Sequence, residues 1–410
     1  MKRPMRWGVM VGGLWLLVGT ACSDPADGGP GDAAALDGST PDGGAPSDDA
    51  TVDGATSPDA GNPGLLFEVV KPAERDARWA GARCNDGTAF AAYVRINPAS
   101  PVWVISLEGG AFCDDDAVSC AQRLLDDPQL TTTIPMADGT LGPGPGRGIL
   151  SRDPVANPDF AAANHVRAHY CSSDFWTGTT TSRRPTTGDP GQGWFFSGRA
   201  NVAALIEILK ERYGLDDTRP GLRVLLAGDS AGAHGAHFTA RMVTGRLPRT
   251  TAAGRIKLLL DAGWMFDWAE PAHRIINTTV ADREVWRAAR VFWASRLDPV
   301  CEAAATDPLD CWFGVGWYPH IRALLPVFLQ QSRRDGSFGG WLHGPNLDYV
   351  LWQAAAETSL AGVDWLWSGA NIYHVLAFND PGWHTGVSPN TLREAVGRFW
   401  AGGAPERILF

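Results

Sequence analysis

One short segment of the chain has the residue types and spacing of a nucleophile elbow. Residues 222–227 are an apolar run of strand length that leads directly into Gly228-Asp-Ser230-Ala-Gly232. This order predicts a strand-to-helix turn so tight that the hydroxyl of Ser230 is exposed. A β-carbon at Gly228 or Gly232 would strike the neighbouring strand or helix. We therefore interpret Ser230 as a nucleophile; the alternative is a small-residue turn capped by a hydroxyl.

A serine hydroxyl is a weak nucleophile at neutral pH, so Ser230 needs a neighbouring base that is oriented by a carboxylate. In the chain order that is typical after such an elbow, the base comes last, and His343, His374 and His384 are the candidates. His384 lies in a predicted loop between the last strand and the last helix, where the base belongs. His374 lies in an apolar run that predicts a packed strand histidine. We expect His384 to be the base, with His374 as the alternative.

The orienting acid should follow a strand that comes after the elbow. Asp335 stands four residues after a predicted strand that ends at residue 331, which is the usual placement. Asp261 ends an earlier strand and is the competitor, although such a residue can also bond backbone amides. Asp380 is too close to His384 in the sequence to be a third member. The sequence favours Asp335.

Hydrolysis through an acyl-enzyme also needs hydrogen-bond donors for the oxyanion. The N–H group of Ala231, directly after the nucleophile, is one candidate. The turn after the early strand 102–107, Gly109-Gly110-Ala111, offers others, because the Gly-Gly pair leaves backbone N–H groups uncovered. We expect backbone amides from these two places to form the oxyanion hole.

The elements that must position these residues alternate between strand-like and helix-like runs. Such alternation predicts an α/β fold, like that of α/β-hydrolases, with a mostly parallel sheet flanked by helices. The site then lies at the carboxyl ends of the strands. The Gly-, Pro- and Thr-rich residues 128–160 and 178–194 are predicted to be irregular loops over that edge. The predicted strands are residues 102–107, 165–170, 222–227, 256–261, 326–331 and 370–378, and the predicted helices are residues 201–213, 284–293 and 391–400.

The first 63 residues are predicted to contain a signal peptide for export, followed by a disordered tether. Residues 1–22 have a basic start, an apolar core and a small-residue cleavage site, which is typical of a signal peptide. Cys22 directly follows the small residues, as in a bacterial lipobox, and we expect it to be lipidated; the alternative is an ordinary secreted protein. Residues 23–63 contain nine Asp and no Lys or Arg, which predicts a disordered tether.

The remaining residues, 64–410, are predicted to form a single catalytic domain. They carry 36 acidic and 32 basic residues with no basic block, which argues against a nucleic-acid partner. Six cysteines in an exported chain indicate three disulfides, and spacing favours Cys113–Cys120 and Cys301–Cys311, leaving Cys84–Cys171.

Metal binding is not expected. The chain has no Cys-x-x-Cys pair. His234 and His237 lie three residues apart on the predicted helix after Ser230, but no third ligand is evident, so helix packing is favoured over a metal site. We expect neither a metal nor an organic cofactor.

Five motifs occur together in one order along the chain. They are Cys84-Asn-Asp-Gly87, Leu107-Glu-Gly-Gly110 with Cys113, Tyr170-Cys-Ser-Ser-Asp174 with Trp176 and Gly178, Leu226-Ala-Gly-Asp-Ser-Ala-Gly232, and Asp261-Ala-Gly-Trp264. This series resembles the pectin acetylesterase/Notum family of serine carboxylesterases. The resemblance covers about residues 80–400 and implies Ser230, Asp335 and His384 as the catalytic residues, with Gly110, Ala111 and Ala231 as the oxyanion amides. Two departures are Ala111-Phe112 after the Gly-Gly pair and Asp229 in place of a small residue.

These observations together predict an exported serine carboxylesterase. Its expected substrates are O-acyl esters, above all O-acetyl esters, on a small molecule or a polysaccharide. Its expected location is the bacterial cell envelope or outer membrane, with Cys22 as a lipid anchor to the membrane, or the outside of the cell. Two alternatives remain: an esterase or thioesterase for long acyl chains, and a non-catalytic module that binds carbohydrate or a partner.

Overall fold

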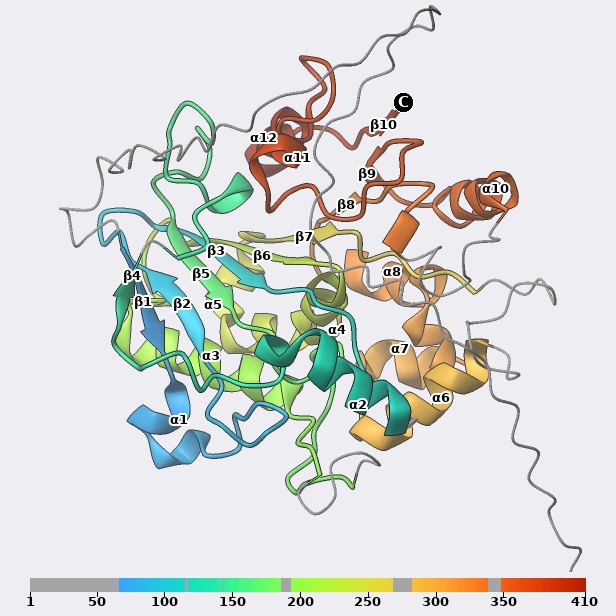
Figure 1. Cartoon of the computed structure of the whole chain (residues 1–410). Helices are drawn as coiled ribbons and strands as arrows, with labels where there is room; N and C mark the ends of the chain where they lie inside the picture. Colours follow the sequence, from blue (N-terminus) through green and yellow to red (C-terminus); the bar gives the residue numbers. More distant parts are fainter. Residues whose placement is uncertain (1–65, 115–116, 143, 186–192, 268–281, 338–347) are drawn as a thin grey trace, which may run out of the picture. The chain divides into compact units, whose positions relative to one another are not determined.

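In the described part of the chain, ten strands form one sheet in the order β10-β9-β8-β7-β6-β3-β5-β2-β1-β4 (Figure 1). The computed structural model describes residues 66–114, 117–142, 144–185, 193–267, 282–337 and 348–410, all of them within one compact unit. From β10 to β5 every neighbouring pair is parallel, whereas β2, β1 and β4 continue the sheet with antiparallel pairs. The strands are β1 (Phe67–Val70), β2 (Ala92–Arg95), β3 (Val102–Leu107), β4 (Leu141–Gly142), β5 (Asn164–Ala168), β6 (Arg223–Asp229), β7 (Ile256–Asp261), β8 (Val327–Gln330), β9 (Trp365–Ser368) and β10 (Arg407–Leu409).

Helices cover both faces of this sheet, because the parallel strands are apolar on both sides. In β6, Val224 and Leu226 belong to one core with α3 and α4, whereas Leu225 and Ala227 belong to a second core with α12. Figure 1 shows α3 and α4 on one side and α11 and α12 on the other. The helices are α1 (Pro72–Arg75), η2 (Ala77–Trp79), α2 (Ala117–Asp126), η3 (Pro128–Leu130), η4 (Gly148–Leu150), α3 (Gly198–Arg212), α4 (Ala231–Arg246), α5 (Pro248–Ala252), α6 (Asp282–Trp293), α7 (Pro299–Ala304), η5 (Pro308–Trp312), α8 (Gly314–Arg322), α10 (Tyr349–Ser359), α11 (Asp380–Trp383) and α12 (Leu392–Ala401).

The mostly parallel sheet flanked by helices confirms the predicted fold class, but one predicted strand is wrong. Residues 370–378 are irregular, and the strand in this region is β9, four residues whose side chains are all buried. The apolar run that imitated a strand includes Ile372 and Tyr373, which are 63% and 56% exposed. The N–H groups of Leu376 and Ala377 bond the carboxylate of Asp261 instead of a neighbouring strand.

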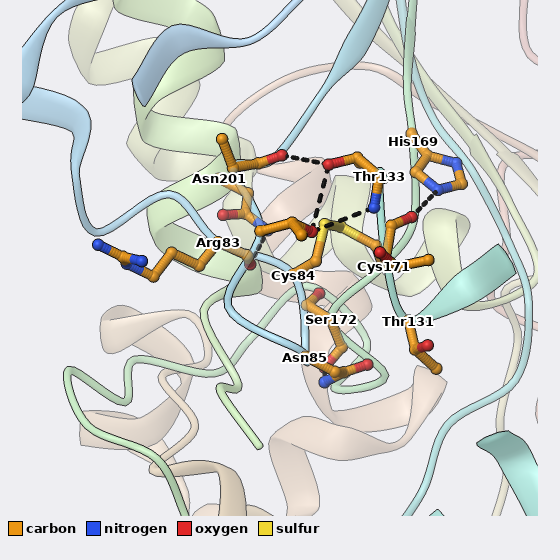
Figure 2. Close-up of a disulfide and its surroundings, with 12 residues drawn as sticks. Arg83, Cys84, Asn85, Thr131, Thr133, His169, Cys171, Ser172 and Asn201 are labelled. Carbon is orange, nitrogen blue, oxygen red and sulfur yellow. Dashed lines mark hydrogen bonds between the residues drawn. A yellow bond between two sulfur atoms is a disulfide. The ribbon is translucent and has the colours of Figure 1, made fainter. Parts of the chain in front are cut away.

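Three disulfides join the cysteine pairs that spacing predicts: Cys84–Cys171, Cys113–Cys120 and Cys301–Cys311. The first links cysteines 87 residues apart, and Figure 2 shows it next to Asn85 and Ser172. The side-chain amide of Asn85 donates to the carbonyl oxygen of Ser172 at 2.9 Å. This bridge therefore fastens the loop before β2 to the segment that follows β5.

Some predictions fall on parts of the chain outside the described residues. They are the signal segment 1–22 with Cys22, the tether 23–63 and His343. Among the helices that the structure does describe, none is long and apolar enough to cross a membrane.

Candidate active site

Ser230 occupies a strained turn between β6 and α4, as expected for a nucleophile elbow. Its φ of 51° and ψ of −122° are unfavourable for a residue with a side chain. A β-carbon at Gly228 would lie 2.1 Å from the carbonyl oxygen of Gly232, and one at Gly232 would lie 2.0 Å from that of Leu107. Both glycines are therefore required for α4 to leave β6 so abruptly beside β3.

The residue that the structure brings to Asp335 is His374. Its Nδ1 lies 2.7 Å from Oδ2 and 2.9 Å from Oδ1 of Asp335, a carboxylate that is 1% exposed just after β8. If Nδ1 carries the proton and donates to Asp335, Nε2 is the nitrogen that can accept one. Burial lowers the pKa of His374, but the charge and hydrogen bond of Asp335, with smaller effects from Asp261 and Asp229, raise it above the ordinary value.

Asp261 connects the loop of His374 to the elbow. Its carboxylate accepts hydrogen bonds from the N–H groups of Leu376 at 3.0 Å and Ala377 at 2.7 Å. Its carbonyl oxygen accepts the N–H group of Ser230 at 2.8 Å. Burial raises the pKa of Asp261 to about 8, although these N–H groups act in the opposite direction. The role seen for Asp261 is thus the bonding of backbone amides, not the orientation of an imidazole.

His384, the expected base, lies elsewhere. It is exposed and directly follows the short helix α11. Asp380, at the start of that helix, accepts the N–H group of Gly148 at 2.7 Å. The structure therefore brings His374 to Asp335 and does not bring His384 there. Both histidines lie between β9 and α12, but only His374 contacts the carboxylate of Asp335.

The predicted oxyanion amides lie at the ends of β3 and β6. Gly110 and Ala111 have φ values of 135° and 55°, and Ala231 is the first residue of α4. Within the described residues, the N–H groups of these three residues have no hydrogen-bond acceptor. The preceding glycine is pressed against the elbow, because a β-carbon at Gly109 would lie 2.9 Å from that of Ser230. The loop after β3 therefore packs directly against Ser230.

Trp176 and Glu108 support this loop from below. The indole Nε1 of Trp176 donates to the carbonyl oxygen of Glu108 at 3.1 Å. The Glu108 carboxylate contacts Nδ1 of His169 and accepts the N–H group of Tyr170, both at 2.9 Å. Burial would raise the pKa of Glu108, but the hydrogen bond and charge of His169, together with Arg167, hold it at about 2. The start of the loop is thus held in place by hydrogen bonds and by the charge of Glu108.

Asp174 explains the Cys-Ser-Ser-Asp-x-Trp-x-Gly motif. This fully buried carboxylate accepts the hydroxyl of Ser172 at 2.7 Å, the N–H group of Trp176 at 3.0 Å and that of Gly198 at 2.8 Å. Burial raises the pKa of Asp174 to about 6 against these bonds. A β-carbon at Gly178 would lie 2.3 Å from the carboxylate. The motif is therefore a structural centre that holds Trp176 beneath the loop.

His234 and His237 are both fully buried on α4. Nε2 of His237 lies 3.3 Å from Nδ1 of His234, and the His237 ring stacks on Trp317 at 4.0 Å. Burial lowers the pKa of His234 to about 3 and that of His237 well below its ordinary value, so both are neutral near pH 7. No group of three His, Cys, Asp or Glu residues that could hold a metal ion occurs in the described part of the chain.

Two charged residues near the elbow were not identified as site residues from the sequence. Arg167 lies in β5, and its NH1 is 2.6 Å from Oδ1 of Asp229, which directly precedes Ser230. The available signal was a charged residue within a predicted buried strand, because a charge in such a place is retained only with a partner.

A parallel sheet with this elbow after a central strand, an acid after β8 and a histidine after β9 is an α/β-hydrolase fold. The model of the pectinacetylesterase family matches residues 70–338, which is more than half of the chain. The protein therefore belongs to the pectinacetylesterase family, as the resemblance implied.

Individual relatives and a solved structure are also similar to this chain. The palmitoleoyl-protein carboxylesterase Notum of Drosophila melanogaster is 33% identical over 251 residues, covering 60% of this chain and 35% of that protein. The Homo sapiens protein of the same description is 29% identical over 261 residues, covering 60% and 48%. The matched region thus spans about a third to a half of these relatives. A crystal structure of the Wnt deacylase Notum from Drosophila superposes with a TM-score of 0.70 at 27% identity, covering 84% of this chain and 96% of that one.

Proposed function

We propose that this protein is an exported serine carboxylesterase with Ser230 as nucleophile, His374 as base and Asp335 as the residue that orients the base. The observation that carries this proposal is the contact of 2.7 Å between Nδ1 of His374 and Asp335, on a loop that Asp261 fastens beside Ser230. His374 takes the place that the sequence assigned to His384.

The proposed reaction has two steps. His374 Nε2 accepts the hydroxyl proton of Ser230 while the Ser230 oxygen bonds the ester carbonyl carbon; the N–H groups of Gly110, Ala111 and Ala231 stabilise the oxyanion. The carbonyl–alkoxy bond then breaks, and the leaving alcohol takes the proton from His374. In the second step water attacks the acyl-enzyme, again with His374 as base, and releases the carboxylic acid and free Ser230.

The proposed substrate class is O-acetyl esters of carbohydrate. The family match to pectinacetylesterases supports a short acyl group. A second support is Phe112, which directly follows the oxyanion loop and is buried against Phe175 and Trp286, with ring centroids at 4.9 Å and 4.8 Å. Trp293 and Trp312 extend this aromatic cluster. We propose that rings packed so closely next to the oxyanion loop favour a short acyl group.

Export is supported by three disulfides, which persist in oxidising compartments. We propose residues 1–22 as the signal segment, Cys22 as a lipid anchor, residues 23–63 as the tether and residues 64–410 as the catalytic domain.

Hydrolysis of a long acyl chain is the second candidate, because the named relatives are palmitoleoyl-protein carboxylesterases. Comparing p-nitrophenyl acetate with p-nitrophenyl octanoate decides between them: a higher kcat/KM for acetate supports the acetylesterase, and a higher value for octanoate supports the alternative. A protein that neither turns over these esters nor reacts with a fluorophosphonate at Ser230 would instead be a binding module.

The base assignment is tested by His374→Ala beside His384→Ala, with Ser230→Ala and Asp335→Ala as references. We expect kcat to fall by about 10⁴-fold or more in Ser230→Ala and His374→Ala. His384→Ala, which changes an exposed residue, should keep kcat within about threefold. Loss of activity in His384→Ala with retention in His374→Ala would return the base to the position expected from the sequence.

A further inference from the structure

A buried ion pair reaches across the strand that leads to the oxyanion loop. Arg167 lies near the end of β5 and Asp229 at the end of β6, with β3 between these two strands. NH1 of Arg167 donates to Oδ1 of Asp229 at 2.6 Å, and the two side chains are only 9% and 11% exposed. The pair therefore passes over the end of β3, where Gly109 begins the loop.

The same aspartate holds that loop directly. The N–H group of Gly109 donates to Oδ2 of Asp229 at 3.3 Å, while Oδ1 is engaged by Arg167. Gly109 has no room for a side chain here, because a β-carbon would lie 2.6 Å from the carbonyl oxygen of Asp229. Asp229 thus fixes the position from which Gly110 and Ala111 extend toward Ser230.

The arginine also contacts the loop of the base. Its guanidinium lies over the ring of Phe378, 4.6 Å from the ring centroid. Phe378 lies four residues after His374 in the same loop. It directly follows Ala377, whose N–H group donates to Asp261. One ion pair therefore touches the oxyanion loop, the elbow and the base loop.

From these contacts we propose that Arg167 and Asp229 form a clamp that positions the three parts of the active site for ester hydrolysis. This inference rests on the proposed function and adds two positioning residues to it. The clamp acts through Gly109 and Phe378 and does not touch the substrate.

Charge explains why both members are needed. A carboxylate next to Ser230 in the chain opposes the negative charge that develops on the ester oxygen, unless a cation compensates it. Arg167 supplies that cation, and its side chain is itself buried. Replacing a buried ion pair with apolar residues often leaves the folding stability of a protein unchanged or increases it. Folding stability alone therefore does not explain why an ion pair occupies this position.

The experiment compares Arg167→Met, Asp229→Asn and the double variant in the full chain. The readouts are kcat and KM for p-nitrophenyl acetate, the rate of fluorophosphonate labelling at Ser230, and the thermal midpoint. The matched controls are Arg241→Met and Asp298→Asn, because that pair is also partly buried, with a contact of 2.7 Å between α4 and the start of α7.

Arg167→Met leaves the charge of Asp229 uncompensated, so we expect kcat and the labelling rate to fall by about 10- to 100-fold with KM changed by less than about threefold. The double variant removes both charges, and we expect it to be at least about threefold more active than Arg167→Met. The controls should lose a similar amount of thermal stability while keeping kcat.

Equal kcat in Arg167→Met and Arg241→Met at matched loss of stability would overturn the clamp. So would a double variant no more active than Arg167→Met. A wild-type protein that neither turns over the ester nor labels would show that the proposed function itself fails, which separates the two outcomes.

Discussion

The carboxylate of Asp261 accepts the N–H group of Ala377 at 2.7 Å. This bond joins the end of β7 to the loop that carries His374, and it gives Asp261 a different task from Asp335. Both carboxylates are buried; Asp261 is the last residue of β7, and Asp335 follows β8. One bonds backbone amides, and the other contacts an imidazole.

Asparagine substitutions should separate these two tasks. In Asp261→Asn the amide oxygen can still accept both backbone N–H groups, so we expect kcat for p-nitrophenyl acetate to stay within about tenfold of wild type. In Asp335→Asn the side chain no longer stabilises the imidazolium, and we expect kcat to fall by about 10⁴-fold. A larger loss in Asp261→Asn than in Asp335→Asn would make Asp261 the catalytic acid.

The pH dependence of hydrolysis should report the raised pKa of His374. His374 must be neutral to accept the proton of Ser230, so kcat/KM rises as pH rises through its pKa. Burial lowers this pKa, but Asp335 and the nearby carboxylates raise it above the ordinary value of 6.5. The acid limb of the kcat/KM profile should therefore lie above pH 6.5. The same limb is expected in His384→Ala; a limb that moves in this variant would contradict the assignment.

The elbow could be predicted from sequence because its constraints are local. Gly228 and Gly232 avoid clashes with atoms that belong to the elbow itself or to the adjacent β3. Their spacing around Ser230 is therefore visible in the sequence. The three disulfides were predictable for a similar reason, because two of them close short loops and leave a single remaining pair.

The proposed base, His374, could not be predicted in this way, because its assignment depends on a contact between residues 39 positions apart. Ile372 and Tyr373 made the segment of His374 look like a buried strand, yet both are exposed. Apolar periodicity reports what a segment could bury, not what it does bury. Arg167 was missed because its partner, Asp229, is reached across β3, and no sequence pattern links those two positions.

The disulfides should contribute unequally to stability. Loss of Cys84–Cys171, which links residues 87 apart, in a Cys84→Ser/Cys171→Ser variant should lower the free energy of unfolding by about 4–5 kcal/mol. Loss of Cys301–Cys311, which links residues 10 apart, should cost about 2–3 kcal/mol. Urea unfolding of the two double variants measures this difference.

Activity should follow the same order, because Cys171 adjoins Ser172, whose hydroxyl bonds Asp174 in the motif that holds Trp176. We expect kcat to fall in the Cys84→Ser/Cys171→Ser variant and to be retained in the Cys301→Ser/Cys311→Ser variant. Full activity in both variants at a temperature where they remain folded would show that the long-range bridge does not support the site.

Two glycines of α4 should respond to alanine in opposite directions. A β-carbon at Gly235 would lie 2.4 Å from the Trp176 ring, whereas nothing lies within 4 Å of one at the exposed Gly245. Gly235→Ala should therefore cost about 1–3 kcal/mol of unfolding free energy through overpacking, and Gly245→Ala should add up to about 1 kcal/mol through helix propensity. Because Trp176 bonds the carbonyl oxygen of Glu108, its displacement should also disturb the oxyanion loop and lower kcat in Gly235→Ala alone. Chemical denaturation with parallel p-nitrophenyl acetate assays measures both effects, and an unchanged kcat in a destabilised Gly235→Ala would show that Trp176 supports the fold without supporting the loop.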